Sequence, residues 1–461
     1  MITNKYSPVT PKDLSYLVQI VGEGNLSRRQ SDLDLHAQDQ SAHAAHRAEA
    51  ILWVENVEQV SRVLAYANEQ RIPVTAWGAG SSLEGNPIPL CGGILISFEH
   101  MNKIVAIHAD DFQVTVQPGL GYKDLNTQLA RHGLFFAPDP GANASIGGML
   151  ANNAAGIRTV KYGATKDNVL RMQVVLADGR VMEAGSRSVK QSSGYDLTHL
   201  FIGSEGTLGL ITEVTLKLAP IPEHISAAVA CCENVGDAIQ AVVAIRGSGT
   251  EPAALEFLDG FTVGSISESN VLGMLPKPTL FMEFHAMHVG ALESVLNSVR
   301  EICLEAGGLN IKTTTNNAER LKLWHARHHT YETIVRRHAG QKVYISDVAV
   351  PISAYPELIA FIEIYRREHN MTAYAFGHAG DGNIHICTPF TDDTYQSVYD
   401  MNTEVVKKAI SLNGTATGEH GVGIGKARFM KMEHGLALDV MHEIKQTLDP
   451  NRILNPGKIF S

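Results

Sequence analysis

WGAGSSLEG, residues 77–85, and DPGANASIGGMLANNAAGIRTVKYG, residues 139–163, are the two stretches that decide the fold of this chain. Neither is a GxGxxG fingerprint opening a helix, and neither is GxxxxGK[ST], so the common dinucleotide and P-loop interpretations fail. Residues 78–82 follow the strand-like IPVTAW and expose backbone N–H groups that could hold a pyrophosphate without Lys or Arg. The glycines of the second stretch would allow close approach to a flat ring. For either stretch alone, simple turn chemistry is an equally good explanation.

The bulk properties exclude several classes of protein. A chain of 461 residues is too long for one compact core, which predicts two or three domains. Its net charge of −10 argues against nucleic-acid binding, which needs clustered Lys and Arg. The N-terminus lacks a signal-peptide pattern, and no apolar stretch is long enough to span a membrane. The five cysteines form no CxxC pair, which favours a reduced cytoplasm.

Hydrophobic periodicity predicts the main elements. Residues 56–70 place apolar side chains on one helical face, and Pro73 follows. QVVLADGRVMEAG (173–185) predicts a hairpin with a type I′ turn at Asp178-Gly179. Pro220 and Pro222 mark a boundary. Beyond them, strands alternate with helices such as 291–306, which predicts an α+β sheet covered on one face.

GHAGDGNIH (377–385) and GEHGVG (418–423) suggest a metal site. His378 and His385 are seven apart, so in a straight strand they would point to opposite faces. The glycines between them allow a turn that would bring both imidazoles to one point. With Glu419 the set becomes His2Glu, which suits zinc or another divalent ion. On the residues alone, two histidines and a distant glutamate are more often a coincidence.

The motifs of both halves, taken in order, resemble a known family. WGAGSSLEG, PGANASIGGMLANNAAG, SSGYDL and GSEGTLGLITEVTLKL look like the FAD-binding domain of vanillyl-alcohol-oxidase-type flavoproteins. LWHARHH, GHAGDGNIH, GTATGEHGVG and NPGKIF look like the FAD-linked 2-hydroxyacid dehydrogenases, a group that includes D-lactate dehydrogenase and glycolate oxidase catalytic subunits. The resemblance covers nearly the whole chain, which makes it more specific than any single motif.

The resemblance implies an α+β fold with a two-part FAD-binding domain and a cap domain whose antiparallel sheet is covered by helices. The expected boundaries are 1–221 for the FAD-binding domain, 222–410 for the substrate (cap) domain with metal ligands, and 411–461 for a C-terminal segment that returns to the FAD-binding domain. Residues 78–82 would wrap the FAD diphosphate, and Asn455 would return to the isoalloxazine. The flavin and its ribityl chain would be lined by Pro140, Gly141, Ser145, Gly148 and Asn152. Glu205 and Ile211 would lie near the adenosine end. The expected FAD-binding residues are Gly78, Ala79, Gly80, Ser81, Ser82, Pro140, Gly141, Ser145, Gly148, Asn152, Glu205, Ile211 and Asn455. Binding is expected to be non-covalent, because WGAGSSLEG contains neither His nor Cys.

The same resemblance assigns the catalytic residues. His378, His385 and Glu419 occupy the family's metal positions, for Zn or Mn. His420 would be the base that takes the hydroxyl proton, with a further ligand or a capping group as the alternative role. Asp381 could orient a ligand histidine or stabilise the turn before Gly382. Arg327 matches the arginine that clamps the substrate carboxylate, and Trp324 and Tyr331 are expected on the same helical face.

Departures from the family narrow the substrate to a short D-2-hydroxyacid, D-lactate first. D-2-hydroxyglutarate dehydrogenases have threonine, lysine and asparagine where this chain has Tyr331, Ile345 and Cys387. A second substrate carboxylate would therefore lack partners. A glycolate oxidase catalytic subunit and a D-2-hydroxyglutarate dehydrogenase remain as alternatives. The electron acceptor stays open (cytochrome, quinone, electron-transferring flavoprotein or partner subunit), as does a homodimer. The expected location is cytoplasmic, with attachment to a membrane through the acceptor as a second option.

Overall fold

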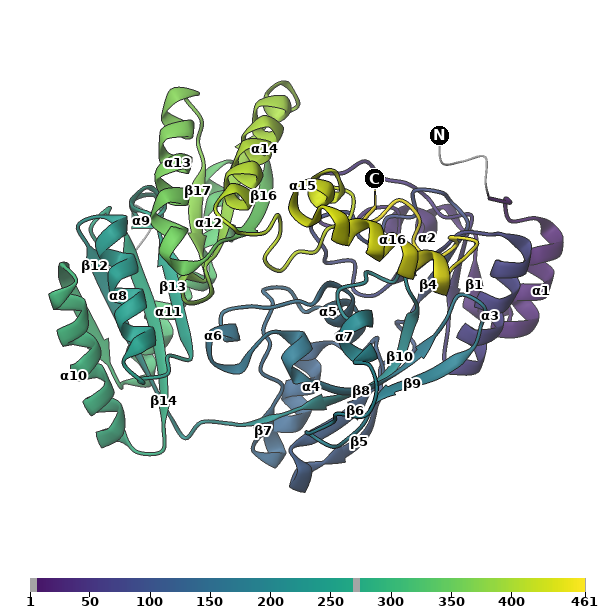
Figure 1. Cartoon of the computed structure of the whole chain (residues 1–461), viewed down its shortest axis with the longest axis horizontal. Helices are drawn as coiled ribbons and strands as arrows, with labels where there is room; N and C mark the ends of the chain where they lie inside the picture. The colour runs from purple at the N-terminus through teal and green to yellow at the C-terminus, as the bar shows by residue number, and fades with distance from the viewer. Residues whose placement is uncertain (1–5, 268–273, 461) are drawn as a thin grey trace. The chain divides into compact units, whose positions relative to one another are not determined.

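The computed structural model describes residues 6–267 and 274–460, and it divides the chain into two compact units (Figure 1). Unit 1 comprises residues 1–155, 164–221 and 419–461, and unit 2 comprises residues 156–163 and 222–418. The boundary expected after residue 221 falls at the same position. The final segment, however, joins unit 1 from Glu419 and not from residue 411, and residues 156–163 belong to unit 2.

Unit 1 is built on two larger sheets and a two-stranded pair of β11 with β7. One has the order β1-β2-β4-β3, with β2, β4 and β3 parallel; the other is antiparallel, in the order β5-β6-β10-β8-β9. Its strands are β1 (Leu26–Ser27), β2 (Ala50–Trp53), β3 (Val74–Trp77), β4 (Ile94–Ser97), β5 (Ile104–His108), β6 (Gln113–Val116), β7 (Leu134–Phe135), β8 (Val169–Val175), β9 (Val181–Gly185), β10 (Leu210–Lys217) and β11 (Ala219–Pro220). Its helices are α1 (Pro11–Val21), α2 (Gln30–Leu35), α3 (Val57–Gln70), α4 (Tyr122–Leu129), α5 (Ile146–Asn152), α7 (Leu197–Phe201), α15 (Met430–His434) and α16 (Leu436–Leu448).

Each of the two larger sheets of unit 1 has its own apolar core. Helices α1 and α3 pack on the parallel sheet, and Val60, Leu64 and Ala67 of the predicted helix are fully buried there. The C-terminal tail returns to the same sheet, because Val74 exchanges backbone hydrogen bonds with Ile453 and Asn455 beside β3. The tail is thus a structural part of unit 1.

The predicted hairpin between β8 and β9 is confirmed, but its predicted turn type is wrong. A type I′ turn needs positive φ at both central residues. Here Gly179 has a φ of +86° and Asp178 does not have a positive φ. The amide of Gly179 donates to the carbonyl of Leu176, and the amide of Leu176 donates to the carbonyl of Arg180. This is a three-residue loop with a type I turn and a left-handed glycine.

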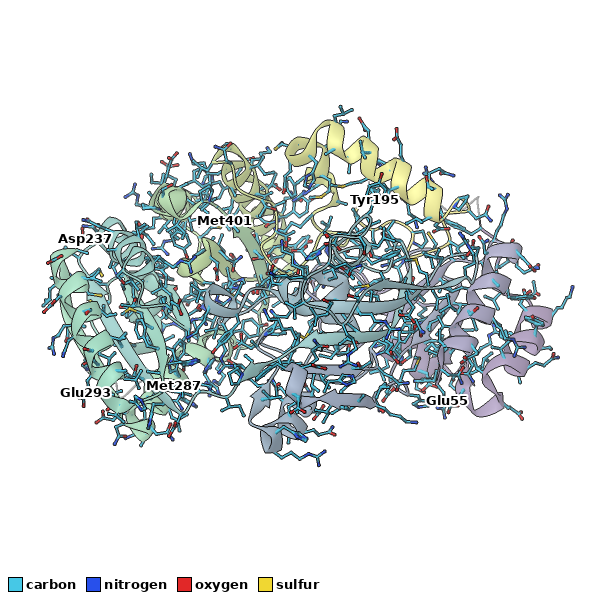
Figure 2. The ribbon with its side chains drawn as sticks, turned by 60° about the horizontal axis from the view of Figure 1, so that its bottom comes forward. Glu55, Tyr195, Asp237, Met287, Glu293 and Met401 are labelled. Carbon is cyan, nitrogen blue, oxygen red and sulfur yellow. The ribbon has the colours of Figure 1, made fainter. Side chains whose placement is uncertain are left out.

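The SSGYDL stretch leads into α7. Asp196 caps that helix by accepting a hydrogen bond from the amide of His199 at 3.2 Å. The preceding Tyr195 is 97% exposed at the surface (Figure 2). The aspartate of SSGYDL therefore has a local structural role, as the N-cap of α7.

Unit 2 contains a seven-stranded antiparallel sheet in the order β15-β12-β14-β13-β17-β18-β16. Its strands are β12 (His224–Cys232), β13 (Ala254–Leu258), β14 (Thr279–Ala286), β15 (Gly308–Thr314), β16 (Lys342–Ala349), β17 (Tyr374–Gly377) and β18 (Asn383–Phe390). Its helices are α6 (Thr159–Tyr162), α8 (Val235–Gly247), α9 (Gly260–Ser267), α10 (Val289–Glu305), α11 (Asn317–His328), α12 (Thr330–Arg337), α13 (Tyr355–Glu368) and α14 (Tyr395–Ser411).

The sheet of unit 2 carries helices on both faces, so the expectation of cover on one face is wrong. Helices α8 and α10 pack on β12, and α14 packs on β16. Helices α9, α11 and α12 contact β17, β12 and β18 and share an apolar cluster with alternate strand residues, including Val229 and Phe376. This second face carries the candidate site.

Candidate functional site

The two glycine-rich stretches of unit 1 meet. Gly78 follows β3, and a Cβ atom built there would lie 2.3 Å from Ser145 Oγ, at the start of α5. Gly80 has a φ of +65° and lies against the Trp77 ring. The backbone N–H groups of residues 78–82 donate no hydrogen bond to any residue that the structure describes. These amides, which have no acceptor among the described residues, lie next to glycines that let a ligand approach the backbone. This arrangement fits the diphosphate of a dinucleotide.

The GEHGVG turn is attached to unit 1 through Glu205. This carboxylate is 4% exposed and accepts hydrogen bonds from the amides of Val422 (2.6 Å) and Gly423 (2.9 Å). Burial raises the pKa of Glu205, and these amide bonds oppose the increase. Asn152 Nδ2 also donates to the carbonyl of His420 at 3.4 Å. The residue expected to act as a base is thus joined to one expected to line the flavin.

Glu205 and Asn455, which the resemblance assigns to different parts of FAD, are in contact with each other. Asn455 Nδ2 donates to the backbone carbonyl of Glu205 at 2.7 Å. The separate roles, the adenosine end for Glu205 and the isoalloxazine for Asn455, stay predictions. Since Glu205 also holds the GEHGVG turn beside Asn152, it groups with the residues expected at the flavin ring. Ile211 lies in β10, and its adenosine-side role stays a prediction.

The turn required between the two histidines is present in unit 2. His378 directly follows β17 and His385 lies in β18, and these strands form an antiparallel hairpin in which Phe376 pairs with His385. Gly382 makes the turn with a φ of +75°, where a Cβ atom would lie 1.9 Å from the carbonyl of Val350. The glycine is therefore required by both conformation and space. Asp381 lies on the same short turn, at residues 379–381.

The imidazoles face each other with their Nε2 atoms 3.4 Å apart. Two nitrogens bound to one tetrahedral zinc at about 2.05 Å would be about 3.3 Å apart. Behind each ring lies a carboxylate: His378 Nδ1 is 2.7 Å from Glu256 Oε1, and His385 Nδ1 is 3.7 Å from Asp347 Oδ1. The hydrogen bond at His378 Nδ1 leaves its Nε2 lone pair available to a metal, whereas the contact of His385 Nδ1 with Asp347 is longer than a hydrogen bond. The donor set therefore fits a divalent ion.

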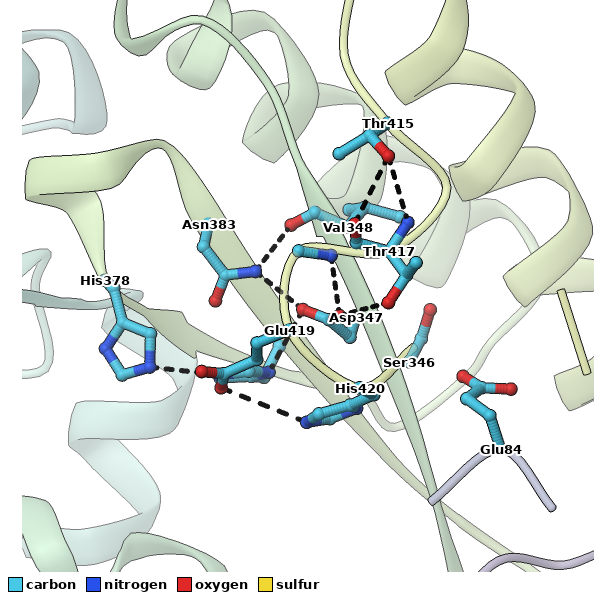
Figure 3. A network of polar contacts seen from close by, with 12 residues as sticks. Glu84, Ser346, Asp347, Val348, His378, Asn383, Thr415, Thr417, Glu419 and His420 are labelled. Carbon is cyan, nitrogen blue, oxygen red and sulfur yellow. Dashed lines mark hydrogen bonds and ion pairs between the residues drawn. The ribbon is translucent and has the colours of Figure 1, made fainter. Parts of the chain in front are cut away.

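Asp347 also ties residues 417 and 418 to the same strands. It pairs with His385 across β16 and β18, and its Oδ2 accepts hydrogen bonds from Thr417 Oγ1 (2.8 Å) and the amide of Gly418 (2.7 Å) (Figure 3). Asn383 Nδ2 donates to Asp347 Oδ1 at 2.6 Å. Glu419 is the next residue, and a trans peptide bond fixes its Cα about 3.8 Å from that of Gly418. Chain connectivity thus keeps Glu419 near the strand that carries His385.

Arg327 is buried, at 7% exposure, and is ion-paired. Its Nε and Nη2 atoms both donate to Glu256 Oε2, at 3.1 and 2.5 Å, and its guanidinium lies 5.1 Å from the centre of the Phe376 ring. Within the described residues, Nη1 makes no hydrogen bond. Burial would raise the pKa of Glu256, but the charges of His378 and Arg327 lower it. The carboxylate therefore stays ionised.

The helix expected to carry Trp324, Arg327 and Tyr331 on one face is interrupted. Helix α11 ends at His328 and α12 begins at Thr330, so the prediction of one helical face is wrong. The His329 ring and the Thr330 hydroxyl hydrogen-bond to backbone carbonyls one turn earlier, in competition with the helix amides. Trp324 and Arg327 are buried, whereas Tyr331 is 39% exposed.

An apolar wall lies next to the histidines along the same strands. Cys387 is two residues beyond His385 on the same face of β18, and its register partner in β16 is Ile345. Both pack in the cluster that contains Trp324 and Phe376. Burial raises the pKa of Cys387 to about 12, so the side chain is a neutral thiol. Burial raises the pKa of Tyr331, and Cys387 adds to this increase.

Sequence reasoning missed Glu256 and Asp347. Each is a fully buried carboxylate in a strand: Glu256 is the one polar residue of ALEFL, and Asp347 lies at the buried end of YISDVA. A lone acidic residue in a buried strand is uncommon and usually has a partner. That pattern could have marked both positions, although it could not have named their partners.

Comparison with known proteins identifies the family of this chain. Residues 48–185 match the FAD binding domain, and residues 221–459 match the C-terminal domain of FAD linked oxidases. The chain belongs to the FAD-linked oxidase family, and it is an FAD-dependent oxidoreductase.

Two of its curated relatives are similar to it over 90% or more of their length. A probable mitochondrial D-lactate dehydrogenase of Danio rerio is 37% identical, covering 96% of this chain and 90% of that protein. The glycolate oxidase subunit GlcD of Bacillus subtilis is 34% identical, covering 96% of each. A 4-ethylphenol oxidase of Gulosibacter chungangensis has the same fold, with a TM-score of 0.78, 18% identity and 98% coverage of each chain.

Two further observations concern the whole chain. All five cysteines are free thiols. Among the helices that the structure describes, none is long and apolar enough to cross a membrane.

Proposed function

We propose that this chain oxidises a short D-2-hydroxyacid, with D-lactate the first candidate, to the 2-oxoacid. The observation that carries the proposal is the pair of Nε2 atoms of His378 and His385, 3.4 Å apart and each backed by a carboxylate. Relatives named as D-lactate dehydrogenases, similar over nearly the whole chain, support the substrate class. FAD, when bound, accepts the hydride from C2 of the substrate.

His378, His385 and Arg327 of unit 2, with Glu419 as a further proposed ligand, would hold the metal and the acid group. His378 and His385 supply two nitrogen ligands, and Glu419 supplies a carboxylate. A divalent ion such as Zn or Mn, when bound, lowers the pKa of the substrate hydroxyl by several units. The unoccupied Nη1 edge of Arg327 donates to the substrate carboxylate. His420 receives the hydroxyl proton on an imidazole nitrogen.

The substrate tail would be small and apolar. The wall formed by Ile345 and Cys387 offers no cation to a second carboxylate, and burying such a group without a partner costs about 1–3 kcal/mol or more. D-Lactate, glycolate and D-2-hydroxybutyrate satisfy this restriction. FAD binding is proposed to be reversible, because residues 77–85 contain neither His nor Cys.

Anaerobic bleaching of the flavin tests the proposal directly. The purified holoprotein is mixed with D-lactate, L-lactate, glycolate and D-2-hydroxyglutarate, and its absorbance near 450 nm, the usual oxidised flavin band, is followed. We expect fast bleaching by D-lactate and slow or absent bleaching by the L-isomer and by the dicarboxylate. Fastest bleaching by glycolate would instead favour a glycolate oxidase catalytic subunit.

Metal analysis of two histidine variants tests the ligand set. His385→Ala should purify without stoichiometric metal and with FAD retained, and its turnover should fall by several orders of magnitude. His338→Ala is the matched control, because His338 hydrogen-bonds to the Tyr374 hydroxyl at 2.8 Å and is not in the ligand set. Full activity of His385→Ala in the presence of a chelator would refute the metal role.

Two other classes remain as outcomes of these tests. Alkyldihydroxyacetonephosphate synthase shares the fold, with a TM-score of 0.77 at 17% identity, so a non-redox transferase is a structural alternative. Such an enzyme would show no bleaching by any hydroxyacid. A colourless protein with hydrolytic activity would indicate a metallohydrolase.

A further inference from the structure

Glu256 is a charged residue in a position that is otherwise apolar. It lies in the middle of β13, between β14 and β17, and it is 0% exposed. All five residues of this strand are buried, and the neighbouring register pair, Phe257 with Gly377, leads directly to His378. An ionised carboxylate in such a place is strongly destabilising unless it is paired.

The two oxygens of Glu256 are divided between two groups. Oε1 lies 2.7 Å from His378 Nδ1, while Oε2 accepts from Nε and Nη2 of Arg327 at 3.1 and 2.5 Å. Arg327 comes from α11, and His378 comes from the β17–β18 hairpin. One side chain therefore joins a candidate metal ligand to the candidate clamp for the substrate carboxylate.

We propose that Glu256 is a positioning residue that locks His378 and Arg327 into one preset arrangement. Its Oε1 holds the proton of His378 on Nδ1, which directs the Nε2 lone pair towards His385. Its Oε2 occupies the Nε–Nη2 edge of Arg327 and so turns the Nη1 edge outwards. Because the hydroxyl and the carboxylate of a 2-hydroxyacid are on adjacent carbons, a fixed spacing between metal and guanidinium would select that class of substrate. This inference rests on the proposed function.

Glu256→Gln is informative because both groups facing the side chain are donors. An amide offers one acceptor oxygen and one donor NH2, so it can satisfy His378 or Arg327 but not both. Asp259→Asn is a matched control. Asp259 is equally buried and pairs with Arg366 at 2.6 Å, but the structure gives it no histidine partner among the described residues.

The experiment measures metal affinity and steady-state kinetics on the purified holoprotein. Zinc affinity is obtained by competition with a chelating dye, and kcat and KM are measured with D-lactate. For Glu256→Gln we expect a 10–100-fold weaker zinc affinity and a KM raised at least tenfold, with FAD content unchanged. Asp259→Asn should change neither quantity by more than about twofold, as expected for a site outside the network. Wild-type zinc affinity and KM in Glu256→Gln would overturn the inference.

A second variant decides the question if Glu256→Gln does not fold. Glu256→Asp keeps the charge but shortens the side chain by one methylene, so the carboxylate cannot reach both partners. It should weaken zinc affinity or raise KM by at least threefold, and unchanged values would again overturn the inference. Failure of the proposed function has a different signature, because the wild type itself would then bind no zinc or leave its flavin oxidised with D-lactate.

Discussion

Ile345→Lys should shift the preference of this enzyme towards dicarboxylic hydroxyacids. Ile345 lies opposite Cys387, which is two residues from His385 on the same face of β18. Neighbouring residues on the same face of a strand are about 6.6 Å apart, so Ile345 and Cys387 lie next to the candidate metal ligand His385. A lysine there would offer an ammonium group to the distal carboxylate of D-2-hydroxyglutarate.

The expected magnitude follows from one charged hydrogen bond in a half-buried setting. Such a bond contributes about 1.5–3 kcal/mol, which corresponds to about 10–150-fold in kcat/KM. The ratio of kcat/KM for D-2-hydroxyglutarate over D-lactate should therefore rise by that factor. D-Lactate oxidation should fall only a few-fold, because the metal ligands and Arg327 are unchanged.

Steady-state kinetics with both substrates provide the assay, and Tyr344→Lys provides the control. Tyr344 is adjacent on β16, but its side chain points to the opposite face, where its hydroxyl accepts a hydrogen bond from Asn402 Nδ2. That variant carries the same added charge away from the wall. A folded Ile345→Lys protein with an unchanged ratio would refute the assignment of this wall to the substrate tail.

Three other outcomes are expected. Gly78→Ala should lose bound FAD, because its Cβ atom would lie 2.3 Å from Ser145 Oγ. Gly24→Ala is the control and should retain FAD, because nothing lies within 4 Å of its Cβ atom. The flavin-to-protein absorbance ratio measures the FAD content of both variants. His420→Ala should abolish turnover with FAD still bound, and retained activity would end the proposed role as base. Burial lowers the pKa of Lys458 from 10.5 to about 8, so the unfolded chain binds more protons between these values and stability attributable to this residue should rise with pH. The free energy of unfolding of the wild type, relative to Lys458→Met, should therefore increase by up to about 3 kcal/mol from pH 8 to 10.5, and a flat difference would contradict the shift.

The sequence by itself determined the family and the outline of the fold. Two glycine-rich stretches and the histidine and Glu-His motifs, in a fixed order along the chain, are local patterns that any reader of the sequence can identify. Helix α3 and the β8–β9 hairpin are likewise set by periodicity and by a turn glycine. The requirement for a turn between His378 and His385 followed from the two-residue period of a strand.

Only the tertiary structure decided which buried side chains contact the residues of those motifs. Glu256 is 71 residues from Arg327 and 122 from His378 along the chain. The side-chain alternation within a strand cannot predict partners that are so distant in sequence. Likewise, only the tertiary structure showed that Glu205 and Asn455, 250 residues apart, are in contact. Local patterns fix local backbone geometry, whereas the pairing of buried charges depends on which elements the packed core brings together.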